Sequence, residues 1–80
     1  MLLMRRLGDE SAAAAQLRDK GLTPRQTDVA LELARTGDTN AQLARSLGMS
    51  AGTVKKHLEA VFRVLGVDSR SGAVVALRSL

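Results

Sequence analysis

Apolar residues recur along most of the chain at the three- and four-residue spacing of a helix, and no segment alternates with period two. The clearest example is the stretch 51–65, whose large apolar side chains share one face, within about 80° of Val54. They are Val54, Leu58, Val61, Phe62 and Leu65. The opposite face carries Gly52, Lys56, Glu59 and Arg63. The pattern predicts an all-α protein whose longest helix has one buried face and one polar face.

Residues with capping side chains precede each apolar pattern: Asp9, Thr23, Thr39, Ser50, and either Asp68 or Ser69. Gln26 and Gln42 stand three positions after the two threonines, which completes two capping boxes, and Pro24 occupies a first helical position. Glycines follow the patterned stretches, as they do at helix ends. The predicted helices therefore cover about 10–20, 24–35, 40–47, 51–65 and 70–80.

The first 21 residues differ from the remainder of the chain. The alanines at 12–15 favour a helix, but the apolar stripe is thin, and we expect a linker helix with modest packing. Residues 22–80 hold the strongly patterned helices and form the predicted domain. The expected fold is a three-helix core plus a C-terminal helix, preceded by the linker helix over 1–21.

The predicted helices 40–47 and 51–65 are joined by a tight turn at 48–50, which is the outline of a helix-turn-helix. In this motif the second helix can lie in the DNA major groove. Its apolar face then docks on the supporting helices and its polar face reaches base edges. The amphipathic pattern of 51–65 fits that arrangement, with the basic side chains near the start of the helix.

Several residues beside this polar face have both a binding interpretation and a structural one. Lys55 flanks the face on one side, and Thr53 and His57 flank it on the other. Lys55 and Lys56 could contact DNA or could simply be solvated. Thr53 could contact a phosphate or only bond back to Ser50, and His57 could be a packing residue.

Composition narrows the classes of function. A chain of 80 residues forms one domain, and Phe62 is its only aromatic residue. Without cysteine, and with one histidine, the chain offers no metal site of the usual ligand types. The net charge is +4, with most of the excess in residues 50–80, which fits a polyanionic partner. No acid–base pair, activated nucleophile or phosphate-binding loop is visible. We therefore expect a cytoplasmic protein that is not an enzyme, with no cofactor and no membrane segment.

Four motifs occur in order along the chain: Leu22-Thr23-Pro24-Arg25-Gln26, Thr39-Asn40-Ala41-Gln42-Leu43-Ala44, Ser50-Ala51-Gly52-Thr53-Val54-Lys55-Lys56-His57, and Leu65-Gly66-Val67-Asp68-Ser69-Arg70-Ser71. Together they resemble the LuxR-type (GerE-like) DNA-binding domain over about residues 22–77. That domain is the four-helix output module of many bacterial response regulators and quorum-sensing regulators. The resemblance implies a sequence-specific, double-stranded-DNA-binding transcription regulator, with 51–65 as the recognition helix and 40–47 as its scaffold.

The resemblance also implies roles for individual residues. Lys55, Lys56 and Glu59 match positions that commonly touch DNA, and Thr53 and His57 match positions that meet the phosphate backbone. With the neighbours that share the exposed face, the candidate DNA-binding residues are Ser50, Gly52, Thr53, Lys55, Lys56, His57, Glu59 and Arg63. The resemblance further implies that the last helix forms the contact of a homodimer. The candidate interface residues are Arg70, Ala73, Val74, Ala76 and Leu77.

Glu59 departs from the family pattern, because several relatives carry a base at this position. A carboxylate repels phosphate, although it can accept a hydrogen bond from cytosine N4, so we expect weaker electrostatics than in a typical member. Two alternative functions remain. One is a domain like sigma-factor region 4, which contacts promoter DNA and RNA polymerase, and the other is a helix-turn-helix fold used for protein interaction. The last helix could also merely cover the core instead of forming a dimer.

Overall fold

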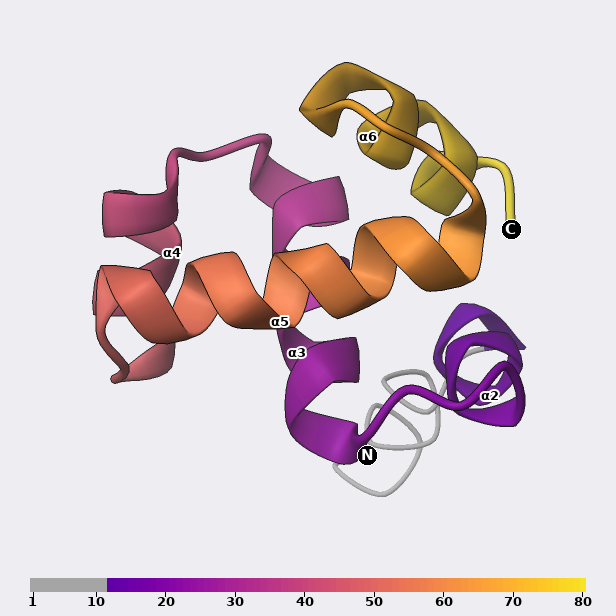
Figure 1. The fold of residues 1–80 in the computed structure, drawn as a ribbon, viewed down its shortest axis with the longest axis horizontal. Helices are drawn as coiled ribbons and strands as arrows, with labels where there is room; N and C mark the ends of the chain where they lie inside the picture. The colour runs from indigo at the N-terminus through magenta and orange to yellow at the C-terminus, as the bar shows by residue number, and fades with distance from the viewer. Residues whose placement is uncertain (1–11) are drawn as a thin grey trace, which may run out of the picture.

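The computed structural model describes residues 12–80, and the described chain is entirely helical apart from its turns. Its helices are α2 (Ala12–Asp19), α3 (Pro24–Thr36), α4 (Asn40–Leu47), α5 (Ala51–Leu65) and α6 (Arg70–Arg78). In Figure 1, α5 runs the length of the molecule, α3 crosses it, α4 lies at one end, and α2 and α6 lie towards the other. The predicted all-α fold class is confirmed. The predicted start of the first helix and its cap, Asp9, fall outside the described residues.

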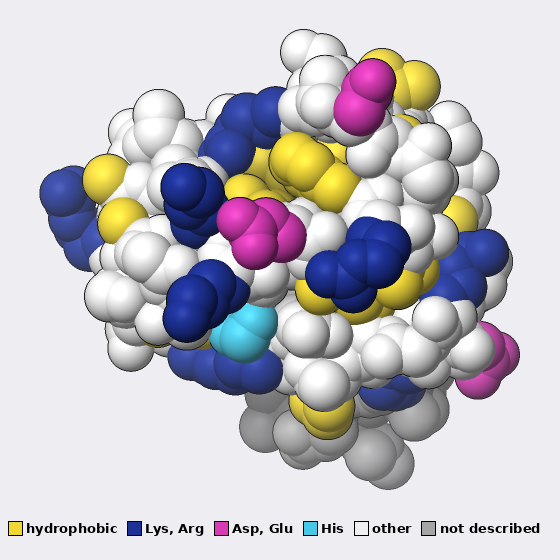
Figure 2. All heavy atoms as spheres, viewed as in Figure 1, with side chains coloured by type: hydrophobic (Ala, Val, Ile, Leu, Met, Phe, Trp, Pro, Cys, Tyr) yellow, Lys and Arg dark blue, Asp and Glu magenta, His cyan; other side chains and the backbone are white. Residues whose placement is uncertain are grey.

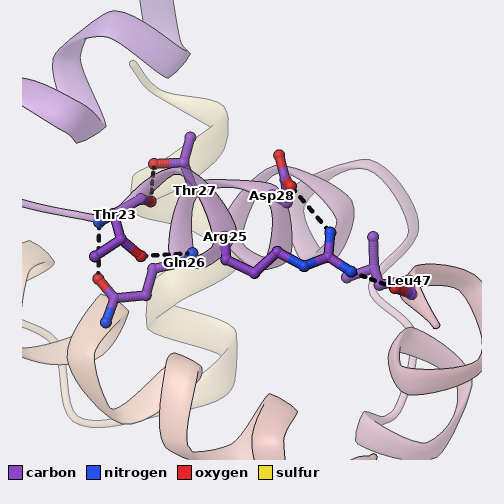
Figure 3. A network of polar contacts seen from close by, with 6 residues as sticks. All are labelled: Thr23, Arg25, Gln26, Thr27, Asp28 and Leu47. Atoms are coloured by element: carbon purple, nitrogen blue, oxygen red, sulfur yellow. Dashed lines mark hydrogen bonds and ion pairs between the residues drawn. The ribbon is translucent and has the colours of Figure 1, made fainter. Parts of the chain in front are cut away.

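The two predicted capping boxes are both present. Thr23 Oγ1 accepts a hydrogen bond from the backbone N–H of Gln26 at 3.1 Å, and Gln26 Oε1 accepts one from the Thr23 N–H at 2.9 Å (Figure 3). Thr39 and Gln42 form the same pair of bonds at 3.2 and 3.0 Å. These bonds satisfy N–H groups that have no partner within the helix. Of the two candidate caps for the last helix, Ser69 is the one that acts.

Left-handed glycines end the three central helices, namely Gly37, Gly48 and Gly66. The one that matters most for the site is Gly48, which has φ 68° and reverses the chain between α4 and α5. A side chain is disfavoured in this conformation because Cβ approaches the following carbonyl oxygen. The turn therefore fixes how α5 leaves its supporting helix.

The core lies around α3, which contacts every other described helix. Its residues Val29, Ala30 and Leu33 are fully buried, as predicted. They pack with apolar residues of the other helices, chiefly Leu17, Leu43, Val54, Val61, Ala73 and Leu77. Arg25, also on α3, donates to the carbonyl oxygen of Leu47 at 2.5 Å and to Asp28 at 3.1 Å (Figure 3). The bond to Leu47 connects α3 to the end of α4, directly before the turn.

The expectation that the first helix packs only modestly is wrong. Leu17 on α2 is fully buried and Ala14 is 3% exposed, and Leu17 belongs to the same apolar cluster as the α3 residues. Two apolar residues three positions apart are enough to dock an eight-residue helix, because they lie on the same face. The proposed boundary between 1–21 and 22–80 therefore stays a prediction, with a shared core across it.

The surface expected on the last helix is also different. Ala73 is fully buried and Leu77 is 4% exposed, so these two candidate interface residues are not available to a partner. The reason is rotational: residues 73 and 77 share the face that packs on the core. Val74 and Ala76 are half-buried, while Val75 is 66% exposed.

Candidate nucleic-acid interface

The exposed face of α5 is held in place by its buried stripe. Val54 and Val61 are fully buried and Leu58 is 4% exposed, so this side of the helix is packed on the core. Phe62 and Leu65 complete the predicted stripe as half-buried residues. A helix docked along its length presents its outer side chains from a rigid support, as a recognition helix requires.

The predicted polar residues lie on the opposite, solvent-facing side. Lys55, Lys56, Glu59, Arg63 and Gly52 are exposed. Figure 2 shows this side of the molecule, where basic side chains gather around an acidic one. His57 is half-buried, so it lies at the margin of the face.

Among the described residues, the charged side chains of this face form no ion pairs. Within residues 12–80, the ion pairs are Arg25–Asp28 and Arg35–Glu32, and both lie on α3. Glu59 therefore forms no ion pair with Lys55 or Lys56, although the sequence spacing allows one. By contrast, Arg70 and Arg78 on α6 both donate to acceptors on other segments. The cations of α5 are left available for an external acceptor.

Ser50 and Thr53 form a hydroxyl pair at the start of α5. Ser50 Oγ accepts from the Thr53 N–H at 3.1 Å, and the two hydroxyl oxygens lie 2.9 Å apart. The structural interpretation of Thr53 as a residue that bonds back to Ser50 is confirmed. Each hydroxyl carries one proton, and a single proton bridges the pair. The second proton remains free to be donated to an outside oxygen such as a phosphate.

A hollow of about 200 Å³ opens beside the polar face, between α5 and the first residues of α4 and α6 (Figure 2). Leu58 and Phe62 provide apolar lining, and the polar lining comes from Lys55, Glu59, Asn40 and Arg70. Arg70 Nη1 donates to Asn40 Oδ1 at 2.7 Å, and Nη2 donates to the carbonyl oxygen of Asp38. The sequence reasoning missed Asn40 and assigned Arg70 to a dimer contact, because no local pattern reveals a bond across 30 positions.

The described part of the chain offers no support for two other kinds of site. No group of three or more His, Cys, Asp or Glu side chains in residues 12–80 could hold a metal ion. Nor does any of the helices from α2 to α6 combine the length and the apolar character needed to cross a membrane.

Comparison with known proteins gives one family. The family model described as "Bacterial regulatory proteins, luxR family" matches residues 20–77. The chain is 41% identical over 58 residues to the "Putative HTH-type transcriptional regulator YhjB" of Escherichia coli K12. The aligned segment covers 72% of this chain and 28% of that protein. The chain is also 41% identical over 59 residues to the HTH-type transcriptional activator RamA of Corynebacterium glutamicum, covering 74% of this chain and 21% of that one.

The match is confined to one part of those relatives, since the chain spans less than a third of the length of either. No solved structure matches the chain significantly. The matched residues 20–77 include α3, α4, α5 and most of α6, so the hollow and the polar face of α5 lie within the matched region.

Proposed function

The chain belongs to the luxR family of bacterial regulatory proteins, and from this premise we propose that it binds double-stranded DNA sequence-specifically, as a transcription regulator or its output domain. The observation that carries the proposal is the contrast between the two sides of α5. One side is packed on the core, and the other presents Lys55, Lys56 and Arg63 without partners among the described residues. In the proposed complex, α5 lies in the major groove.

The side chains of this face have different proposed roles. Lys56, Lys55, Glu59 and Arg63 face base edges, where lysine and arginine donate to guanine and a carboxylate accepts from cytosine N4. Thr53 and His57 contact the phosphate backbone, with Ser50 holding the Thr53 hydroxyl in position at 2.9 Å. At Gly52, the missing side chain lets the helix approach the duplex closely. Backbone contacts position the protein, and base contacts specify the sequence.

The proposal is tested by selecting bound duplexes from a random pool and measuring affinity against salt. A monomer that contacts three to five phosphates should give a log–log slope of roughly −3 to −4.5. Changing Lys56 to Ala should relax the sequence preference, and changing Thr53 to Val should weaken binding to every sequence alike. Lys20→Ala is the matched control, because it removes the same charge at an exposed position outside α5.

Two outcomes would contradict this function. A salt-independent affinity would exclude the phosphate contacts, and equal losses for the Lys56 and Thr53 variants on every sequence would exclude the division of roles. Capture of core RNA polymerase in a pull-down would instead favour the alternative related to sigma-factor region 4.

We further propose that the chain forms a homodimer through the exposed edge of α6. Val75 is 66% exposed, Leu80 is 37% exposed, and the half-buried Val74 and Ala76 border them. A two-fold contact would bury this apolar edge against its own copy. Val75→Asp should shift the sedimentation behaviour from dimer to monomer without lowering thermal stability. A wild-type chain that sediments as a monomer at high concentration, and when bound to a palindromic duplex, would contradict the proposal.

A further inference from the structure

Arg70 joins three parts of the molecule that are distant in sequence. It is the first residue of α6, and its guanidinium group donates to the side chain of Asn40 and to the backbone carbonyl of Asp38. Asn40 is the first residue of α4, and Asp38 lies in the preceding turn. Both bonds are partly buried and charge-assisted, a class that is stronger than neutral hydrogen bonds.

The position of this contact distinguishes it from the other arginine contact of α6. Arg78 donates to the carbonyl oxygen of Ala34 at 2.9 Å, but it does so at an exposed site near the end of α3. Arg70 acts at the opposite end of α6, where α4 begins and where the hollow opens beside Lys55 and Glu59. The two arginines anchor opposite ends of the same helix, and only Arg70 adjoins the proposed DNA-binding face.

The residues around the hollow indicate which segments Arg70 positions. Asn40 and Arg70 line it together with Lys55 and Glu59 of α5, above the apolar side chains of Leu58 and Phe62. Further along, α4 and α5 pack through the apolar core, with Leu43 and Ala44 against the α5 stripe. At the start of α4 the hollow leaves an open space, which packed side chains do not fill. The Arg70 guanidinium spans the start of α6 and the start of α4, the two elements that border this hollow beside α5. Its planar pair of donors constrains both the distance and the direction of the first turn of α4.

We infer that Arg70 is a positioning residue for the DNA-binding face, acting through Asn40 to fix the first turn of α4 against the Lys55–Glu59 edge of α5. The inference rests on the function proposed above. It gives α6 a role in the DNA-reading unit besides covering the core or forming a dimer. Lysine cannot replace this arginine fully, because its single ammonium group does not reproduce the rigid pair of donors.

The experiment compares Arg70→Met with Arg78→Met in the full 80-residue chain. Both changes remove one charge and one or more bonds from α6, so the Arg78 variant controls for general loosening of the helix. Duplex affinity is measured at a temperature where circular dichroism shows each variant to be fully folded. We expect the Arg70 variant to bind its selected duplex about tenfold more weakly, within the usual range of coupling between linked sites. The Arg78 variant should keep its affinity, and Arg70→Lys should recover part of the loss.

A double-mutant cycle tests whether Arg70 acts through Asn40. Asn40→Ala should weaken duplex binding as Arg70→Met does, and the double variant should lose no more than either single change. Asn40→Ala combined with Arg78→Met should show no such coupling. If Arg70→Met does not fold, Asn40→Ala removes the same bond from the other side and gives the same test. Additive losses for Asn40 and Arg70 would overturn the inference.

Amide hydrogen exchange provides a readout that needs no DNA. The N–H groups of Gln42 and Leu43 are both bonded to Thr39, at 3.2 and 2.9 Å, and report the order of the first turn of α4. Arg70→Met should speed their exchange, whereas Arg78→Met should not. Unchanged exchange at these amides would overturn the inference, whatever the duplex result. Faster exchange in a chain that binds no duplex would support the positioning link and contradict only the DNA-binding function.

Discussion

Changing Leu17 to Ala should destabilise the domain strongly, because Leu17 is a fully buried member of the core. The change removes three carbon atoms from an apolar site. At about 0.8 kcal/mol each, their lost burial costs about 2.4 kcal/mol. The space left behind adds to this loss, which brings the expected total to about 2–5 kcal/mol. A chain of this length has a free energy of unfolding of only roughly 4–12 kcal/mol, at 0.05–0.15 kcal/mol per residue.

Urea denaturation followed by circular dichroism measures this loss directly, and the melting temperature should fall by at least about 8 °C. Gln16→Ala is the matched control, since residue 16 is the exposed neighbour of Leu17 on the same helix. That change should stay within about 0.5 kcal/mol of wild type. If Leu17→Ala costs less than about 1 kcal/mol, α2 is no integral part of the core. The first helix would then be the loosely packed linker that its sequence suggested.

Two glycines near the turn should respond oppositely to alanine. Gly48→Ala should cost about 1–2 kcal/mol of stability, because its φ of 68° is left-handed. Gly52→Ala should stabilise the fold by about 0.5–1 kcal/mol, because Gly52 lies within α5 and its Cβ would meet only Ser50 Oγ, at 3.9 Å. Equal urea midpoints for the two variants would contradict these opposite effects. The hydrogen bond from Arg35 lowers the pKa of Glu32 from its ordinary 4.5. The ionised form therefore stabilises the fold above pH 4.5, and this contribution is lost as the pH falls through the lower folded pKa. Glu32→Gln should remove that part of the acid dependence, and identical stability–pH curves would show that the pair contributes nothing.

The helix boundaries could be predicted because the interactions that set them are local. Thr23 and Gln26 satisfy each other across three positions, and Thr39 and Gln42 do the same, so both partners of each bond are visible in one short stretch. The predicted span of α5 is the observed one, because Ser50 caps its start and Gly66 ends it, and both signals are local. The exposed side of α5 follows from the same pattern, since a large apolar stripe determines the opposite face.

The short helices at either end could not be oriented from sequence for a physical reason. Their stretches are rich in alanine, at 12–15 and at 73 and 76, so burying one side or another changes little apolar area. In α6, the exposure of Val75 and the burial of Ala73 are set by where the helix meets the core of α3 and α5. The orientation of α6 therefore depends on tertiary packing, and the apolar residues within α6 do not determine it.

The long-range arginine contacts could not be predicted from the sequence either. They decide which basic side chains are used within the fold and which remain on the surface. Arg25 and Arg78 donate to backbone carbonyl oxygens 22 and 44 positions away. Every residue has such a carbonyl, so no pattern of side chains marks the acceptor. These bonds occupy arginines of α3 and α6 inside the fold, whereas Lys55, Lys56 and Arg63 have no such partner within the described residues. For binding a polyanion, the net charge of +4 therefore matters less than which basic side chains lie free on the surface. Arg25, Arg70 and Arg78 join helices through hydrogen bonds. On the outer face of α5, Lys55, Lys56 and Arg63 form no ion pair among the described residues and lie beside the acidic Glu59.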